Sequence, residues 1–283
     1  MPIKLIALDI DGTLLNSRWE VSPANRAALA EATRRGIEVA LVTGRRYDFA
    51  LPVIQQIDSP LTMIVNNGAM VRDKDGATRL RHLLQKDTAC RVVQVTSPWR
   101  ECTSVVFDRP KGNQVIVEKI DFEDGIRGMY YRRNREFLGE AAPLEKCLTE
   151  DPIQVMLAGP VAPMREAESV LRSVQFSKEF TLAVTLYEDK DFSMIDVIHA
   201  SITKGSTLSE WAALRNIAGA DTLAIGDNHN DLEMLSFAGI PVVMGNGVPE
   251  LKARGWHVTL SNDEDGVAAA IWQFALQEAP ECA

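Results

Sequence analysis

Two aspartates separated by one residue, Asp9 and Asp11, come directly after an apolar stretch at residues 3–8. That stretch is apolar enough to be a buried parallel strand, and in extended backbone residues two apart point the same way. A buried carboxylate is costly unless it is paired, hydrogen-bonded or bound to a metal. Gly12 follows, and its missing Cβ opens space for a ligand close to the main chain. The pattern predicts a chemically active pair of carboxylates at a strand end, with an ordinary Asp-Gly turn as the plain structural alternative.

Further polar residues stand at comparable places, at strand ends or at the helix starts that follow. They are Thr43 after residues 37–42, Lys204 at the start of a helical stretch, and Asp227 and Asp231 after residues 222–225. Carboxylates suit Mg²⁺, which keeps waters and substrate phosphate oxygens among its ligands. An ammonium and helix N-termini suit phosphate oxygens. One site for phosphate and Mg²⁺ accounts for all of these residues, whereas the alternative needs separate helix caps and a surface lysine.

The elements that would position these residues follow the rhythm of a parallel sheet covered by helices on both faces. Strands are expected at 3–8, 37–42, 61–65, 222–225, 240–244 and 256–260, and helices at 24–35, 47–57 and after residues 203, 232, 249 and 265. The first strands end in polar or glycine-containing turns, at the edge where open α/β sheets bind ligands. The predicted fold class is α/β, with a Rossmann-like, doubly wound parallel sheet.

Between the two halves of this pattern the alternation is lost. After a hairpin at Asp75-Gly76, helices are expected at 88–95 and 163–174, and strands at 103–107, 114–119, 153–158 and 181–187. This mixture indicates an inserted α+β domain of ordinary size. We therefore expect a discontinuous core domain of residues 1–82 and 197–283, and an inserted domain of residues 83–196.

The composition argues against several classes of protein. The chain has 283 residues, of which 46% are apolar and 24% charged, which is typical of globular proteins. A net charge of −9 argues against nucleic acid as the main partner. No apolar run is long enough for a membrane span, and the first strand starts so early that we expect no signal peptide. Four scattered cysteines, Cys90, Cys102, Cys147 and Cys282, indicate reduced thiols in a cytoplasmic protein. The sequence carries no signature of an oligomeric state.

Four short motifs, in this order, resemble those of the haloacid dehalogenase-like hydrolases. They are Asp9-x-Asp-Gly-Thr, Thr43-Gly-Arg, Lys204-Gly and Gly226-Asp-x-x-Asn-Asp231. The long insert between the second and third motifs resembles the Cof-type phosphatase branch with its C2 cap. Residues 66–69 and 244–247 look like the accessory loops of that branch. Residues 198–202, before Lys204, depart from it, since relatives tend to have a Pro/Lys/Gly-containing turn there.

The resemblance implies a Mg²⁺-dependent phosphatase that hydrolyses small phosphate monoesters, such as sugar phosphates, through an aspartyl-phosphate. Asp9 would be the nucleophile and Asp11 the acid and base. The metal ligands would be Asp9, the backbone carbonyl of Asp11, and Asp227. The phosphate would be held by the backbone at Ile10 and Gly44 and by the side chains of Thr43, Lys204 and Asn230. Asp231 would orient Lys204 or a metal-bound water.

Three alternatives use the same residues differently. A phosphomutase would pass the phosphoryl group to a second hydroxyl, and measuring free phosphate against isomerised product separates it from a phosphatase. A Mg²⁺- and phosphate-responsive binding module, in which Asp9 is only modified, needs neither Asp11 nor a large insert. A dehalogenase does without Mg²⁺ and without the acidic cluster around Asp227. We therefore expect a phosphatase whose partner is a small phosphorylated metabolite.

Overall fold

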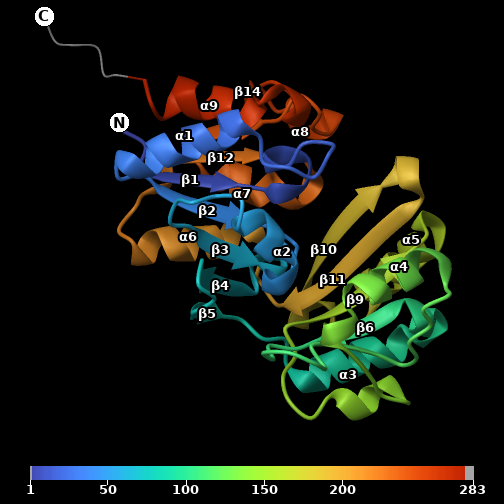
Figure 1. Ribbon diagram of the computed structural model, residues 1–283. Coiled ribbons are helices and arrows are strands. Elements are labelled where there is room, and N and C mark those ends of the chain that lie inside the picture. The colour runs from blue at the N-terminus through green and yellow to red at the C-terminus, as the bar shows by residue number, and fades with distance from the viewer. Residues whose placement is uncertain (1, 278–283) are drawn as a thin grey trace, which may run out of the picture. The chain divides into compact units, whose positions relative to one another are not determined.

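The computed structural model describes residues 2–277 and divides the chain into two compact units (Figure 1). The first unit joins Met1–Arg81 to Thr203–Ala283, and the second is His82–Ile202. The second boundary lies later than the expected residue 197, because strand β11 (Phe192–His199) pairs with β9 and β10 in the sheet of the inserted unit.

The first unit is built on an eight-stranded sheet. In sheet order its strands are β14 (His257–Val258), β13 (Ile240–Val243), β12 (Thr222–Gly226), β1 (Leu5–Leu8), β2 (Glu38–Val42), β3 (Thr62–Val65), β4 (Met70–Asp73) and β5 (Thr78–Arg81). All pairs from β14 to β3 are parallel, and β4 and β5 add an antiparallel hairpin at one edge. The predicted parallel α/β core, discontinuous in sequence, is confirmed.

Helices cover both faces of this sheet, as the continuous burial of its central strands β1, β3 and β12 requires. They are α1 (Pro23–Arg34), α2 (Tyr47–Ile54), α6 (Lys204–Leu214), α7 (Leu232–Phe237), α8 (Pro249–Lys252) and α9 (Gly266–Phe274). Figure 1 shows α1 and α9 together on one face, while α6 lies on the other. Leu5 and Ala7 of β1 share a buried cluster with Leu208 of α6 and Met234 of α7. The site-bearing strand β1 is therefore central and buried on both sides.

The second unit is an α+β domain with a six-stranded sheet. In sheet order its strands are β10 (Phe180–Tyr187), β11 (Phe192–His199), β9 (Gln154–Gly159), β6 (Thr103–Val106), β7 (Val115–Val117) and β8 (Leu138–Glu140), and its helices are α3 (Lys86–Val95), α4 (Gly125–Arg133) and α5 (Val161–Ser173). The sequence analysis did not predict α4, β8 or β11. Asp196 interrupts the apolar run of β11, and two glycines with three arginines weaken the helical pattern of α4.

Two expectations from the sequence concern membrane-spanning helices and disulfide bonds. None of the helices within residues 2–277 combines the length and the apolar character that a bilayer crossing requires. Cys90, Cys102 and Cys147 form no disulfide within the part of the chain that the structure describes. Cys282 lies outside the described residues.

Candidate active site

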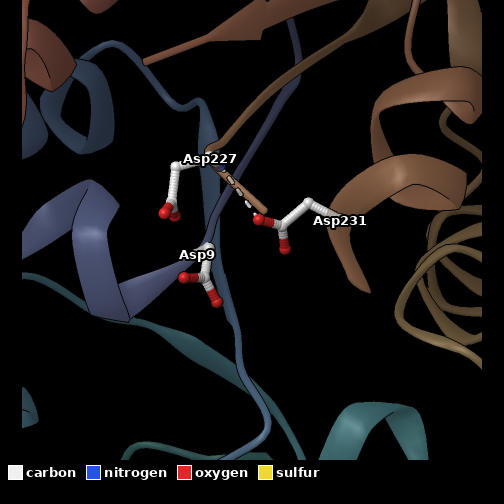
Figure 2. A group of neighbouring side chains, drawn as sticks. All are labelled: Asp9, Asp227 and Asp231. Carbon is white, nitrogen blue, oxygen red and sulfur yellow. Dashed lines mark hydrogen bonds between the residues drawn. The ribbon is translucent and has the colours of Figure 1, made fainter. Parts of the chain in front are cut away.

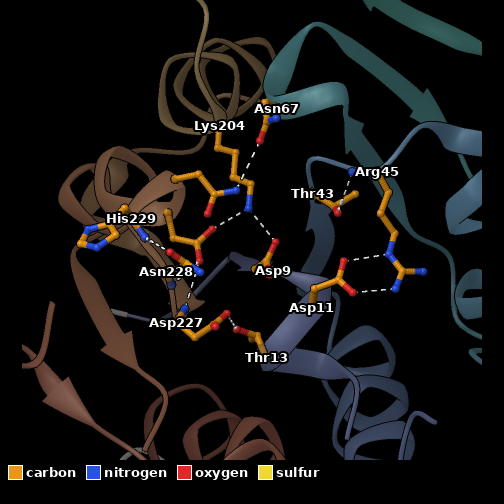
Figure 3. Close-up of polar contacts among 12 residues, drawn as sticks. Asp9, Asp11, Thr13, Thr43, Arg45, Asn67, Lys204, Asp227, Asn228 and His229 are labelled. Carbon is orange, nitrogen blue, oxygen red and sulfur yellow. Dashed lines mark hydrogen bonds and ion pairs between the residues drawn. The ribbon is translucent and has the colours of Figure 1, made fainter. Parts of the chain in front are cut away.

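The register of the sheet brings the four motif segments to one edge. Leu8, the last residue of β1, pairs with Leu41 of β2 and with Ile225 of β12. Asp9, Thr43 and Asp227 follow within two residues of these positions, so they gather at the carboxyl edge of the sheet. Lys204 is the first residue of α6 and extends its side chain to the same place (Figure 3).

A single wide turn, Ile10–Leu14, follows Asp9 and begins with the fully buried Ile10. Within it Gly12 has a φ of 79°, and a Cβ there would lie 2.4 Å from Oδ2 of Asp227. The hydroxyl of Thr13 donates a hydrogen bond of 2.8 Å to Oδ1 of Asp227. The space that Gly12 opens is therefore bordered by the Asp227 carboxylate, which this turn holds beside Asp9.

A buried lysine links two of the carboxylates. The Nζ of Lys204 lies 2.6 Å from Oδ1 of Asp9 and 2.7 Å from Oδ1 of Asp231 (Figure 3). A capping box between Thr203 and Ser206 fixes the first turn of α6, which carries Lys204. The other oxygen of Asp231 accepts hydrogen bonds from the backbone N–H groups of Asp227 and Asn228. Asp231 therefore holds both Lys204 and the Asp227 loop in place.

Three carboxylates share this small space, since oxygens of Asp9, Asp227 and Asp231 lie within 4.8 Å of one another (Figure 2). Burial raises the pKa of Asp9 to about 7, against the opposing effect of Lys204. Burial and the charge of Asp9 raise the pKa of Asp227 well above its ordinary value. Burial opposes the charge of Lys204, but the carboxylates of Asp231 and Asp9 prevail and raise its pKa. One ammonium does not offset burial and the mutual repulsion of three carboxylates, which is why Asp9 and Asp227 hold their protons more tightly than an exposed aspartate does.

The donor set fits a hard divalent cation. Oδ1 of Asp9 is engaged by Lys204 and Oδ1 of Asp227 by Thr13, while Oδ2 of each has no hydrogen bond from the part of the chain that the structure describes. One or two carboxylates with room for waters and substrate oxygens is the arrangement that Mg²⁺ prefers. Asp231 is less available, because hydrogen bonds engage both of its oxygens. The residues present thus suit Mg²⁺ held by Asp9 and Asp227.

Asp11 points toward Arg45 and forms a bidentate ion pair with it (Figure 3). Nε of Arg45 lies 2.7 Å from Oδ2 of Asp11, and Nη2 lies 2.6 Å from Oδ1. Asp11 was expected from the sequence, but Arg45 as its partner was not, although Arg45 belongs to the second motif. To donate a proton elsewhere, the Asp11 carboxyl must first leave Arg45.

Comparison with known proteins decides the family. The model of a family described as haloacid dehalogenase-like hydrolase matches residues 6–271. The chain belongs to this family. The resemblance drawn from the four motifs, including the Cof-type branch, is thereby confirmed.

Relatives match this haloacid dehalogenase-like chain over nearly its whole length. Phosphatase YwpJ of Bacillus subtilis (strain 168) is 29% identical over 287 residues, which cover 94% of this chain and 98% of the relative. The 5-amino-6-(5-phospho-D-ribitylamino)uracil phosphatase YwtE of the same organism is 28% identical, covering 96% and 98%. A crystal structure of a haloacid dehalogenase-like hydrolase from Bacteroides thetaiotaomicron superposes with a TM-score of 0.79 at 24% identity, covering 96% and 99%. That structure shares the fold.

Three of the predicted phosphate-binding residues of this haloacid dehalogenase-like site, Thr43, Gly44 and Asn230, contact a neighbouring turn, Asn66–Gly68. Asn67 donates its backbone N–H to the carbonyl of Thr43 at 3.0 Å, and its side-chain oxygen accepts from Nδ2 of Asn230 at 3.4 Å. A Cβ at Gly44 would lie 3.1 Å from the Asn67 amide, so the two groups are closely packed. Thr43 is buried, and its hydroxyl accepts from the N–H of Arg45. The sequence analysis had placed Asn67 only in an accessory loop.

Proposed function

We propose that the protein is a Mg²⁺-dependent phosphatase that hydrolyses small phosphate monoesters through an aspartyl-phosphate on Asp9. Membership of the family and relatives named phosphatases support the phosphatase class. The observation that carries the mechanism is the buried contact between Asp9 and Lys204, at a sheet edge that also bears Thr43 and Asp227. The relative YwtE is named for one small phosphate monoester, 5-amino-6-(5-phospho-D-ribitylamino)uracil.

In the first step, a carboxylate oxygen of Asp9 attacks phosphorus, and the bond from phosphorus to the leaving oxygen breaks. Lys204 holds the Asp9 carboxylate in a fixed orientation through its contact with Oδ1. Lys204, Thr43, Asn230 and backbone N–H groups of the surrounding turns would stabilise the non-bridging oxygens as charge shifts onto them. Asp11, released from Arg45, gives its proton to the leaving alkoxide.

In the second step, water attacks the phosphorus of the aspartyl-phosphate and gives its proton to Asp11. The bond between phosphorus and Asp9 breaks, which restores the Asp9 carboxylate and releases inorganic phosphate. The proton on Asp11 is then available for the next leaving group. The ion pair with Arg45 holds Asp11 as a carboxylate in the substrate-free protein, so Asp11 takes up a proton from solvent when it leaves Arg45 for the first turnover.

The metal would be held by Asp9, Asp227 and the backbone carbonyl of Asp11, and when bound it offsets the repulsion between carboxylate and phosphate. Thr13 orients the Asp227 carboxylate through a hydrogen bond, and Gly12 leaves room for that carboxylate because it has no Cβ. Asp231 would contribute indirectly, since it orients Lys204.

The inserted unit would serve as the cap of this enzyme. A lid of this kind excludes water during the reaction and contacts the leaving group. We place the cap at the inserted unit, whose division from the core falls at Arg81/His82 and Ile202/Thr203.

Release of phosphate from p-nitrophenyl phosphate tests the proposal. We expect turnover with Mg²⁺, loss of turnover in EDTA with recovery on adding Mg²⁺, and loss of turnover in Asp9→Asn. Thermal unfolding of Asp9→Asn controls for misfolding. Full activity of Asp9→Asn, or full activity in EDTA, would contradict the mechanism.

A further inference from the structure

An exposed tryptophan lies next to the ion pair of Asp11 and Arg45. The guanidinium carbon of Arg45 lies 5.4 Å from the ring centroid of Trp19 and 5.2 Å from that of Phe49. The Arg45 side chain is therefore largely covered, whereas Trp19 remains 63% exposed. Most of the apolar surface of the indole is exposed, beside the residue assigned as acid and base.

The loop that carries Trp19 is closed by its own hydrogen bonds. The side-chain oxygen of Asn16 accepts from the backbone N–H groups of Arg18 and Glu20, each at 3.0 Å. The N–H of Trp19 donates to the carbonyl of Asn16 at 2.9 Å. Trp19 itself has a φ of 63°, a backbone conformation that is unfavourable for a bulky residue. The chain thus holds an exposed indole on an ordered loop at an energetic cost.

Asp11 fixes where the leaving group must be. Proton transfer needs the leaving oxygen within roughly 2.6–3.2 Å of the Asp11 carboxyl. In the ion pair that carboxyl lies 2.6–2.7 Å from two Arg45 nitrogens, and the same guanidinium contacts the indole. When it leaves Arg45, the Asp11 carboxyl can move only by the reach of its own short side chain. The atoms of the substrate that follow the leaving oxygen therefore come within reach of Trp19.

We propose that Trp19 is a specificity-determining residue that stacks against a planar aromatic leaving group of the substrate. Two aromatic faces attract one another beyond the apolar area that they bury, so the exposed indole selects aromatic over aliphatic alcohols. The proposal rests on the proposed phosphatase function, because it assigns the leaving-group end of that site.

Benzyl phosphate and cyclohexylmethyl phosphate provide a matched pair of substrates. Both carry the phosphate on a CH₂ group and have similar size, but only the first has an aromatic ring. The ratio of their kcat/KM values is the readout, because any effect of the substitution on Asp11 or Arg45 acts on both esters and cancels. In Trp19→Ala we expect the ratio to fall about fivefold. In Trp19→Phe, which keeps an aromatic face, we expect the ratio to stay close to the wild-type value. Trp272→Ala, which removes an exposed tryptophan from α9, should leave the ratio unchanged.

Binding gives a second readout that does not depend on turnover. Calorimetric Kd values for benzylphosphonate and cyclohexylmethylphosphonate should show the same loss of aromatic preference in Trp19→Ala, while the inhibition constant of inorganic phosphate stays unchanged. If Trp19→Ala does not fold, Trp19→Leu retains an apolar side chain without the aromatic face. Hydrolysis of neither ester by the wild-type protein would overturn the proposed function. Hydrolysis of both with equal ratios in wild type and Trp19→Ala would overturn only the role of Trp19.

Discussion

The ammonium of Lys204 lies 2.6 Å from Oδ1 of Asp9, and both residues are buried. Asp231, which is fully buried, holds the same ammonium from a second side at 2.7 Å. Removing one partner from a buried ion pair leaves an uncompensated charge. Lys204 is therefore expected to contribute to stability as well as to phosphate binding.

Lys204→Met keeps much of the side-chain length and removes the charge. We expect the free energy of unfolding to fall by about 3 kcal/mol, and phosphatase activity to be lost. Lys4→Met is the control, because Lys4 pairs with Asp221 at 2.8 Å but is 54% exposed. That surface pair should contribute less than about 1 kcal/mol. Equal urea midpoints for the two variants would show that the buried Asp9–Lys204 pair contributes no more to the free energy of unfolding than the exposed Lys4–Asp221 pair does.

Gly12 and Gly36 offer a matched pair of glycines. Their φ angles are 79° and 80°, so alanine carries a similar backbone cost of about 1 kcal/mol at either position. A Cβ at Gly12 would meet Asp227, whereas nothing lies within 4 Å of a Cβ at Gly36. Gly12→Ala should therefore lose activity and the stabilisation by Mg²⁺, measured as a shift in the thermal midpoint. Gly36→Ala should lose only stability, and loss of activity in both variants would contradict this assignment for Gly12.

Much of the core and its site could be predicted from the sequence, because local signals and global fold agree there. Asp9 stands at the end of a continuous apolar strand, and Lys204 follows the Thr203 cap of a helix, so their positions at the carboxyl edge follow from the topology of a parallel sheet. The role of Gly12 needed coordinates, since Asp227, which occupies the space beside it, is distant in the chain.

Other features have no local signature in the sequence. Arg45 pairs with Asp11 only because the loops after β1 and β2 meet, and the indole of Trp19 reaches Arg45 from a later part of the loop that carries Asp11. The strand β11 was missed because Asp196 lies in its middle, and its side chain is buried beside Gln154. A buried polar pair of this kind is satisfied by tertiary contacts that hydrophobic periodicity does not report.

Asp11→Asn should separate the two chemical steps. p-Nitrophenolate is a good leaving group and needs little help from an acid, whereas attack by water on the aspartyl-phosphate still needs a base. We expect a burst of one p-nitrophenolate per site followed by turnover slowed by about 100-fold or more. Intact-mass spectrometry during the burst should find one added phosphoryl group, and Asp9→Asn should show neither the burst nor the adduct. A uniform slowing without an adduct would contradict the role of Asp11 in the second step.

The raised pKa of Asp9 predicts how stability depends on pH when no metal is bound. Burial raises this pKa from 3.8 to about 7. Between these values the folded protein keeps a proton that the unfolded chain releases, so the free energy of unfolding decreases as the pH rises. The stabilising contribution is complete below the unfolded pKa and is lost as the pH passes through the folded pKa.

Mg²⁺ should remove much of this pH dependence, because it binds the deprotonated carboxylate and stabilises the folded protein more as the pH rises. Thermal midpoints measured between about pH 5 and about pH 7 should fall in EDTA and should fall less with saturating Mg²⁺. Asp9→Asn, which carries no titrating group at this position, should show a weaker decline in EDTA. Identical slopes in wild type and Asp9→Asn would show that Asp9 does not titrate in this range.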